Sequence, residues 1–141
     1  MKAFRSIAAI TILISTTFSQ NNKDDWPNLN RYQSDNENVK KGKKKSPRVV
    51  FIGNSITEGW DWHYPEFFNK NRNYINRGIS GQTTPQMLVR FRQDVVDLKP
   101  DIVVILAGIN DIAENTGPST VKSITDNIIS CLLYTSPSPR D

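Results

Sequence analysis

The stretch VVFIGNSITEGW, residues 49–60, decides the fold. Residues 49–52 form an unbroken β-branched and aromatic run, which is typical of a strand buried on both faces of a parallel sheet. Gly53 ends the run and allows the backbone to turn sharply. The residues that follow Ser55 predict a helical region that includes residues 65–70, so the stretch begins with a strand, a turn and a helix.

The same unit recurs twice further along the chain. Residues 73–77 predict a short second strand that ends at Gly78, and residues 85–98 predict a helix. One face of that helix is apolar and consists of Met87, Leu88, Phe91, Val95 and Leu98. Residues 102–107 predict a third strand, apolar on both faces, and residues 119–130 a third helix. This alternation predicts an α/β fold, a three-layer α/β/α sandwich with a mainly parallel sheet.

Each predicted strand is followed by a motif of glycine and polar residues. The first motif is GNSI at residues 53–56, the second is GISGQT at residues 78–83, and the third is GIND at residues 108–111. Ligands of such sheets bind at the carboxyl ends of the strands, where all three motifs lie. Taken singly, Ser55 has the features of a helix N-cap, Gly81 of a turn residue and Asn110 of an Asx-turn. Taken together, the motifs predict one nucleophile, Ser55, and two oxyanion donors.

The three motifs resemble those of the SGNH hydrolases, also called GDSL esterases and lipases, over about residues 25–130. Asn54 stands where that family more often has aspartate. The resemblance implies a flavodoxin-like fold and a serine esterase that works through an acyl-enzyme intermediate. Ser55 would attack the ester carbonyl, and the oxyanion would be held by the N–H groups of Ser55 and Gly81 and by the Asn110 side chain.

The sequence departs from the family at the catalytic base. The family's base belongs to a D-x-x-H block near the end of the domain, and these 141 residues contain no such block. The one histidine, His63, is expected to line the mouth of the site, because acting as base would require a relay unlike the family's. We therefore expect the natural protein to be an esterase. For residues 20–141 alone we expect no esterase turnover. We also expect poor solubility, since an uncovered sheet edge tends to associate with other chains.

The two ends of the chain predict segments outside the domain. Residues 1–19 have the basic start, apolar run and small-residue cleavage site of a signal peptide, which predicts a secreted or periplasmic protein without a stable membrane anchor. Residues 131–141 resemble the translation of a transposase adapter used in sequencing libraries, so we expect a non-native tail and a gene that continues past Ser130. Between them we expect a polar segment over residues 20–46, with a short helix near Trp26 and a Lys-rich linker, and a partial hydrolase domain over residues 47–130.

Composition limits the other function classes. The contents of 37% hydrophobic and 23% charged residues indicate a globular domain. The net charge of +4 comes from the Lys-rich run near residues 40–48, which predicts a solvated linker and no nucleic-acid partner. One histidine and one cysteine predict neither a metal site nor a cofactor. The expected partner is a small-molecule, carbohydrate O-acetyl or lipid ester.

Two other classes of function stay open at this point. One is a non-catalytic flavodoxin-like module that binds a phosphate at the Gly53 or Gly78 loop, although neither loop matches a phosphate-binding motif. The other is an exported adhesive protein with Trp26, Trp60 and Trp62 as its interaction surface.

Overall fold

The computed structural model describes residues 25–114 and 120–135. The predicted signal peptide and residues 136–141 of the predicted tail lie outside this part of the chain. A three-stranded parallel sheet has the order β2-β1-β3, with β1 (Val49–Gly53) between β2 (Tyr74–Gly78) and β3 (Ile102–Leu106). The predicted α/β class is confirmed.

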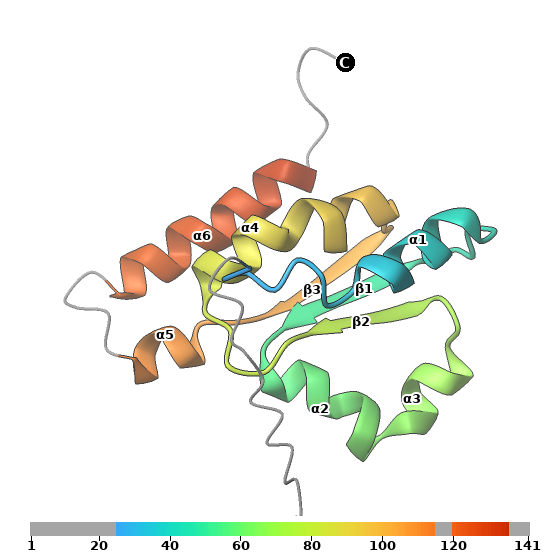
Figure 1. Ribbon diagram of the computed structural model, residues 1–141, viewed down its shortest axis with the longest axis horizontal. Coiled ribbons are helices and arrows are strands. Elements are labelled where there is room, and N and C mark those ends of the chain that lie inside the picture. Colours follow the sequence, from blue (N-terminus) through green and yellow to red (C-terminus); the bar gives the residue numbers. More distant parts are fainter. Residues whose placement is uncertain (1–24, 115–119, 136–141) are drawn as a thin grey trace, which may run out of the picture.

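Helices cover both faces of the sheet, as Figure 1 shows. On one face lie α1 (Gln33–Lys41), α4 (Thr84–Asp94) and α6 (Thr120–Thr135). On the other lie α2 (Ser55–His63) and α3 (Pro65–Lys70). A short helix, α5 (Ile109–Ala113), follows β3, and a 3₁₀ turn, η1 (Val96–Leu98), follows α4.

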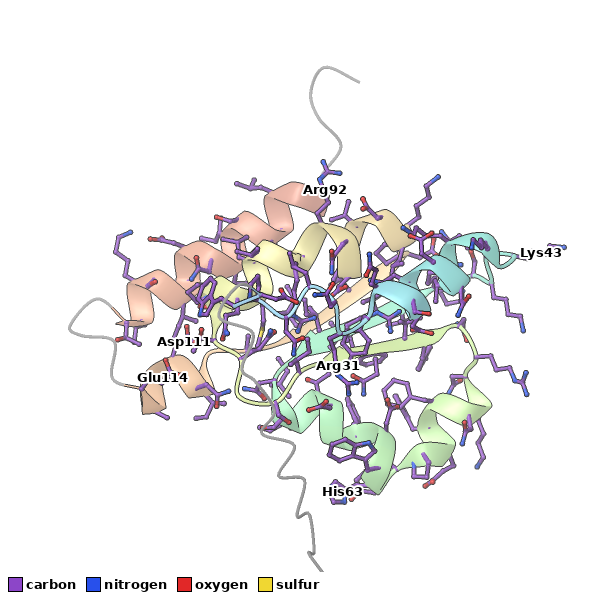
Figure 2. All side chains as sticks on the ribbon, in the orientation of Figure 1. Arg31, Lys43, His63, Arg92, Asp111 and Glu114 are labelled. Carbon is purple, nitrogen blue, oxygen red and sulfur yellow. The ribbon has the colours of Figure 1, made fainter. Side chains whose placement is uncertain are left out.

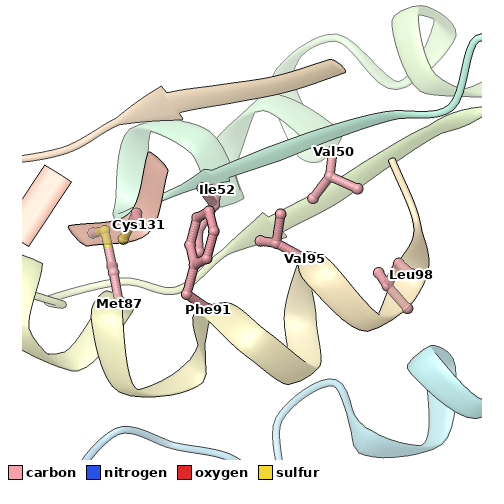
Figure 3. Packing of buried hydrophobic residues seen from close by; sticks show 7 residues of the cluster. All are labelled: Val50, Ile52, Met87, Phe91, Val95, Leu98 and Cys131. Atoms are coloured by element: carbon pink, nitrogen blue, oxygen red, sulfur yellow. The ribbon is translucent and has the colours of Figure 1, made fainter. Parts of the chain in front are cut away.

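The main core lies between β1 and α4 (Figure 3). Its buried side chains are Val50, Ile52, Met87, Phe91, Val95, Leu98 and Cys131. The apolar face predicted for residues 85–98 is therefore the face that packs on the sheet. The α-helix ends at Asp94, earlier than predicted, and the 3₁₀ turn carries Leu98 into the core.

An aromatic cluster fills the space between the sheet and the other two helices. Phe51 of β1 meets Trp60 edge-on at 5.6 Å between ring centroids, and Trp60 stacks on Phe67 at 5.0 Å. Phe68 and Tyr74 complete the cluster. Such pairs add to the apolar burial that holds α2 and α3 on the sheet.

The third strand is covered on one face only, although the sequence makes it apolar on both faces. Val103 and Ile105 pack against the main core. Ile102, Val104 and Leu106 point the other way and are 49%, 38% and 46% exposed, because α2 and α3 pack on β1 and β2 and do not extend over β3. A row of apolar side chains therefore faces solvent.

The segment before β1 is a packed part of the domain. Three glutamine side chains of the second motif and α4 donate to its backbone: Gln82 to Pro27 O at 2.7 Å, Gln86 to Trp26 O at 2.8 Å and Gln93 to Leu29 O at 2.7 Å. The helix of this segment begins at Gln33, after turns that Asp25 supports by accepting from the Leu29 and Asn30 N–H groups. The segment thus docks on the domain through its backbone carbonyl groups.

The last helix runs further than predicted. It continues to Thr135, whereas the sequence predicts an end at Ser130. Cys131 is 5% exposed and belongs to the main core. The foreign origin of residues 131–141 stays a prediction. Among the described residues, no helix combines the length and hydropathy of a membrane-crossing segment.

Candidate active site

The register of the sheet brings the three motifs to one edge. Gly53 of β1 pairs with Gly78 of β2 on one side and with Leu106 of β3 on the other. The residues that follow these partners therefore leave the sheet side by side. Ser55, Gly81 and Asn110 all lie in the segments that directly follow the three strands, as expected for a site at the carboxyl ends of parallel strands.

Ser55 is the first residue of α2 and is exposed. The Asn54 side chain caps the helix by accepting from the Ile56 N–H at 3.2 Å. Gly53 must lack a side chain, because a Cβ there would lie 2.6 Å from the Leu106 carbonyl oxygen and 2.0 Å from Thr57 Oγ1. Among the described residues, no acceptor binds the Ser55 N–H, so this donor at the positive end of α2 is free.

The second motif leaves one N–H group free. The Ser80 N–H donates to Glu58 Oε2 at 2.8 Å, the Gln82 N–H to the Ile79 carbonyl at 3.4 Å, and the Thr83 N–H to Gln86 Oε1 at 2.9 Å. Gly81 has a φ of +77° and open space around its Cα, and its N–H has no acceptor in the described part of the chain. It is therefore the available donor of this turn.

The third motif begins the short helix α5. Asn110 Nδ2 donates to the Gln82 carbonyl at 2.9 Å, which binds the third motif to the second. An amide nitrogen carries two hydrogens, so a second donor of Asn110 remains. This contact joins residues 28 apart, and it is not the local Asx-turn that was the alternative for a lone asparagine.

Asp111, labelled in Figure 2, belongs to the same helix and is buried, and its hydrogen bonds fix the start of α4. Its carboxylate accepts from the Thr84 N–H at 3.0 Å and from Thr84 Oγ1 at 2.6 Å. Asn127 of α6 donates to the same hydroxyl at 2.9 Å. Asp111 thus orders the second and third motifs relative to each other.

An open cleft of about 560 Å³ lies beside Ser55. It is lined by Ser55, Ile56, Gly59, Trp60, His63 and Tyr64. His63 ends the helix that Ser55 begins (Figure 2). With a helical rise of about 1.5 Å per residue, the eight residues between them amount to about 12 Å. His63 therefore lines the same cleft but is too far away to take a proton directly from Ser55.

Arg90 is the central residue that sequence reasoning missed. It is 0% exposed and donates to the Gly53 carbonyl at 3.2 Å, the Arg77 carbonyl at 2.9 Å and Gln82 Oε1 at 2.6 Å. Burial lowers the pKa of its guanidinium below the ordinary value, while Asp94, at 3.0 Å, opposes the shift. Its position between Met87 and Phe91, on an apolar helix face, was the available signal. Arg90 ties the ends of β1 and β2 to the second motif.

Within the described residues, no group of three or more His, Cys, Asp or Glu side chains is arranged to hold a metal ion.

Comparison with curated proteins gives two partial relatives. The chain is 36% identical over 78 residues to the uncharacterized lipoprotein YqeF of Bacillus subtilis, a match over 46% of this chain and 32% of that protein. It is 47% identical over 38 residues to an acetylxylan esterase of Geobacillus stearothermophilus, over 27% of this chain and 17% of the esterase. The chain thus spans a third or less of these relatives.

Solved structures give longer matches. A candidate acylhydrolase of Bacteroides fragilis is 53% identical with a TM-score of 0.70, and the match covers 77% of this chain and 51% of that one. A GDSL-like lipase of Bacteroides thetaiotaomicron is 48% identical with a TM-score of 0.69, over 77% and 55%. The model of the GDSL-like Lipase/Acylhydrolase family matches residues 51–139, which is more than half of the chain and includes all three motifs. The chain belongs to the GDSL-like lipase/acylhydrolase family.

Proposed function

We propose that the protein is a serine esterase with Ser55 as its nucleophile. The observation that carries the proposal is the pair of free N–H groups, of Ser55 and Gly81, at the sheet edge where Asn110 also lies. Membership of an acylhydrolase family supports it. Unpaired donors at the N-terminus of a helix and in a turn suit a negative charge that develops during a reaction.

The proposed reaction proceeds in two steps. Ser55 Oγ bonds to the ester carbonyl carbon and gives up its proton to a base, and the carbonyl oxygen becomes an oxyanion bound by the Ser55 and Gly81 N–H groups and by Asn110. The tetrahedral species expels the alcohol, which takes up a proton, and leaves an acyl-enzyme. Water then attacks the acyl carbon and releases the acid and free Ser55.

The base is not provided by the one histidine of this sequence, given its separation from Ser55. The family resemblance assigns the role to a D-x-x-H block, which these 141 residues do not contain. An unassisted serine hydroxyl is a weak nucleophile. We therefore expect these residues alone to show no Ser55-dependent turnover.

The proposed substrates are O-acetyl esters of carbohydrates. An acetylxylan esterase is among the relatives of this chain, and the cleft beside Ser55 offers the aromatic rings of Trp60 and Tyr64 next to polar groups. Aromatic side chains provide a rigid apolar face of the kind that packs on a ring-shaped ligand. The predicted signal peptide and the lipoprotein relative support a location outside the cytoplasm.

The test starts from the source DNA. The reading frame is followed through the Ser130 junction, and the protein encoded there is assayed on acetylated xylo-oligosaccharides and on p-nitrophenyl esters of short and long acids. We expect acetate release that Ser55→Ala abolishes and Asn110→Ala lowers by about 100-fold, since one oxyanion donor is worth about that much in kcat. A preference for long-chain esters would replace the carbohydrate substrates by lipids. Ligand binding without turnover, unaffected by Ser55→Ala, would favour the binding module instead.

A further inference from the structure

Glu58 connects the helix of the proposed nucleophile to the turn of the proposed oxyanion donor. It lies one turn after Ser55 in α2. Its Oε2 atom accepts from the Ser80 N–H at 2.8 Å and also from the Ser80 hydroxyl. The next residue, Gly81, carries the free N–H group. No other hydrogen bond in the described part of the chain joins a side chain of α2 to this turn.

The contact decides which N–H group of the turn is free. Without Glu58, the Ser80 N–H would be a second unpaired donor, next to that of Gly81. With Glu58 in place, the N–H groups of Ser80, Gln82 and Thr83 all have acceptors, and only that of Gly81 lacks one. In this arrangement Gly81 has a φ of +77°.

A carboxylate this close to an oxyanion would normally oppose the reaction, because two negative charges repel. Arg31 offsets part of this repulsion through an ion pair with Glu58 Oε1 at 2.9 Å. Burial acts to raise the pKa of the Glu58 carboxyl, but the hydrogen bonds from Ser80 and Arg31 outweigh it and hold that pKa below its ordinary value. The group is therefore an ionised acceptor at neutral pH, with Arg31 as its counter-charge.

The backbone next to Glu58 is fixed as well. Gly78 approaches α2 so closely that a Cβ there would lie 2.1 Å from the Glu58 nitrogen. Tyr32, the neighbour of Arg31, donates its hydroxyl to the Gly78 carbonyl. The helix, the end of β2 and the segment before β1 thus meet around this one carboxylate.

We propose that Glu58 is a positioning residue for the esterase site: by binding Ser80 it holds the Gly81 turn against the helix that begins with Ser55, and Arg31 keeps its charge from opposing the oxyanion. The inference rests on the proposed function. Glu58 itself touches no reacting atom.

The first test is independent of catalysis. Hydrogen exchange of the 141-residue chain is measured by mass spectrometry for Glu58→Ala, Glu58→Gln and the control Glu37→Ala, which removes an exposed ion pair with Lys40. We expect the Ser80 amide to exchange at least about tenfold faster in Glu58→Ala, with strand β1 unchanged, and an intermediate rate in Glu58→Gln, whose amide oxygen still accepts. Equal exchange in Glu58→Ala and Glu37→Ala would overturn the inference.

The second test uses the protein read through the Ser130 junction. We expect Glu58→Ala to lower kcat at least about tenfold with KM within about twofold, because the lost alignment concerns the oxyanion rather than the bound ester. Glu58→Gln should recover part of kcat, and Glu37→Ala should match the wild type. If Glu58→Ala leaves the Ser55-dependent turnover unchanged, the inference about Glu58 is refuted while the proposed function stands. Absence of turnover in the wild type would refute the proposed function, while the exchange result would still decide whether Glu58 holds the turn.

Discussion

At the scale of single residues, Gly78 comes closer to the backbone of another element than any other glycine of the described part of the chain. The atoms it would meet are backbone atoms of Thr57 and Glu58, which cannot move aside as a flexible side chain would. We expect Gly78→Ala to lower the free energy of unfolding by at least about 2 kcal/mol, measured by urea denaturation.

Gly42 provides the matched control. Its Cβ would lie 3.3 Å from the Asn38 carbonyl oxygen, and its φ of −71° suits any residue. Gly42→Ala should change the stability by less than about 1 kcal/mol. Equal effects of the two substitutions would mean that β2 and α2 are further apart than described.

The reactivity of the Cys131 thiol reports on the packing of the last helix. Burial raises the pKa of its thiol to about 11. At pH 8 we therefore expect iodoacetamide to react at least about 100-fold more slowly with the folded chain than with the chain in urea, because the thiolate is the reactive form. Since the unfolded thiol ionises first, this group's contribution to stability is complete below about pH 8.5 and is lost as the pH rises toward 11.

As the only cysteine, Cys131 gives a single labelled site. Labelling of the folded chain as fast as in urea would show that this residue is not in the core. That result would agree with a foreign origin of residues 131–141.

At the scale of elements, helix α4 contains a buried ion pair and helix α6 an exposed one. Arg90 and Asp94 are both 0% exposed, and Asp94 also accepts from Asn36 Nδ2 at 2.6 Å. Asp94→Ala leaves a buried guanidinium without its counter-charge, so we expect a loss of about 3–5 kcal/mol in urea denaturation.

The exposed pair of α6 has the same spacing and is the control. Lys122 and Asp126 are 77% and 56% exposed. Asp126→Ala should cost less than about 0.5 kcal/mol. A small effect of Asp94→Ala would show that the neighbours of Arg90 compensate its charge without the carboxylate.

The sequence predicted those elements whose signal is local. The spacing of apolar side chains predicts the strands and the apolar face of α4. The glycine after each predicted strand marks the position of the motif that follows it. The contacts that organise the site are of another kind. Glu58 meets Ser80 across 22 residues and Arg31 across 27, and no periodicity encodes such pairs. Helix α5 was missed because five residues are too few for a helical pattern.

At the scale of the whole molecule, we expect the uncovered face of β3 to govern association. Within the described residues this strand pairs only with β1, so its other edge is open, next to the exposed row of Ile102, Val104 and Leu106. We expect the 141-residue chain to elute in size-exclusion chromatography as concentration-dependent oligomers, and Val104→Lys to shift it toward the monomer.

Val89 is the control for this experiment, since it is 53% exposed but lies on α4, which packs on the opposite face of the sheet. Val89→Lys should leave the elution unchanged. If both lysine variants behave alike, net charge rather than the β3 edge controls the association.

The packing of the segment before β1 also has a consequence for the order of events during synthesis. Its backbone carbonyls at residues 26, 27 and 29 receive their hydrogen bonds from glutamines 55 to 64 residues later in the chain. This segment therefore leaves the ribosome before the glutamines that bind it have been synthesised, and it cannot dock until α4 has emerged. Contacts of such long sequence separation form late, so the earliest part of the domain to be made is among the last to dock.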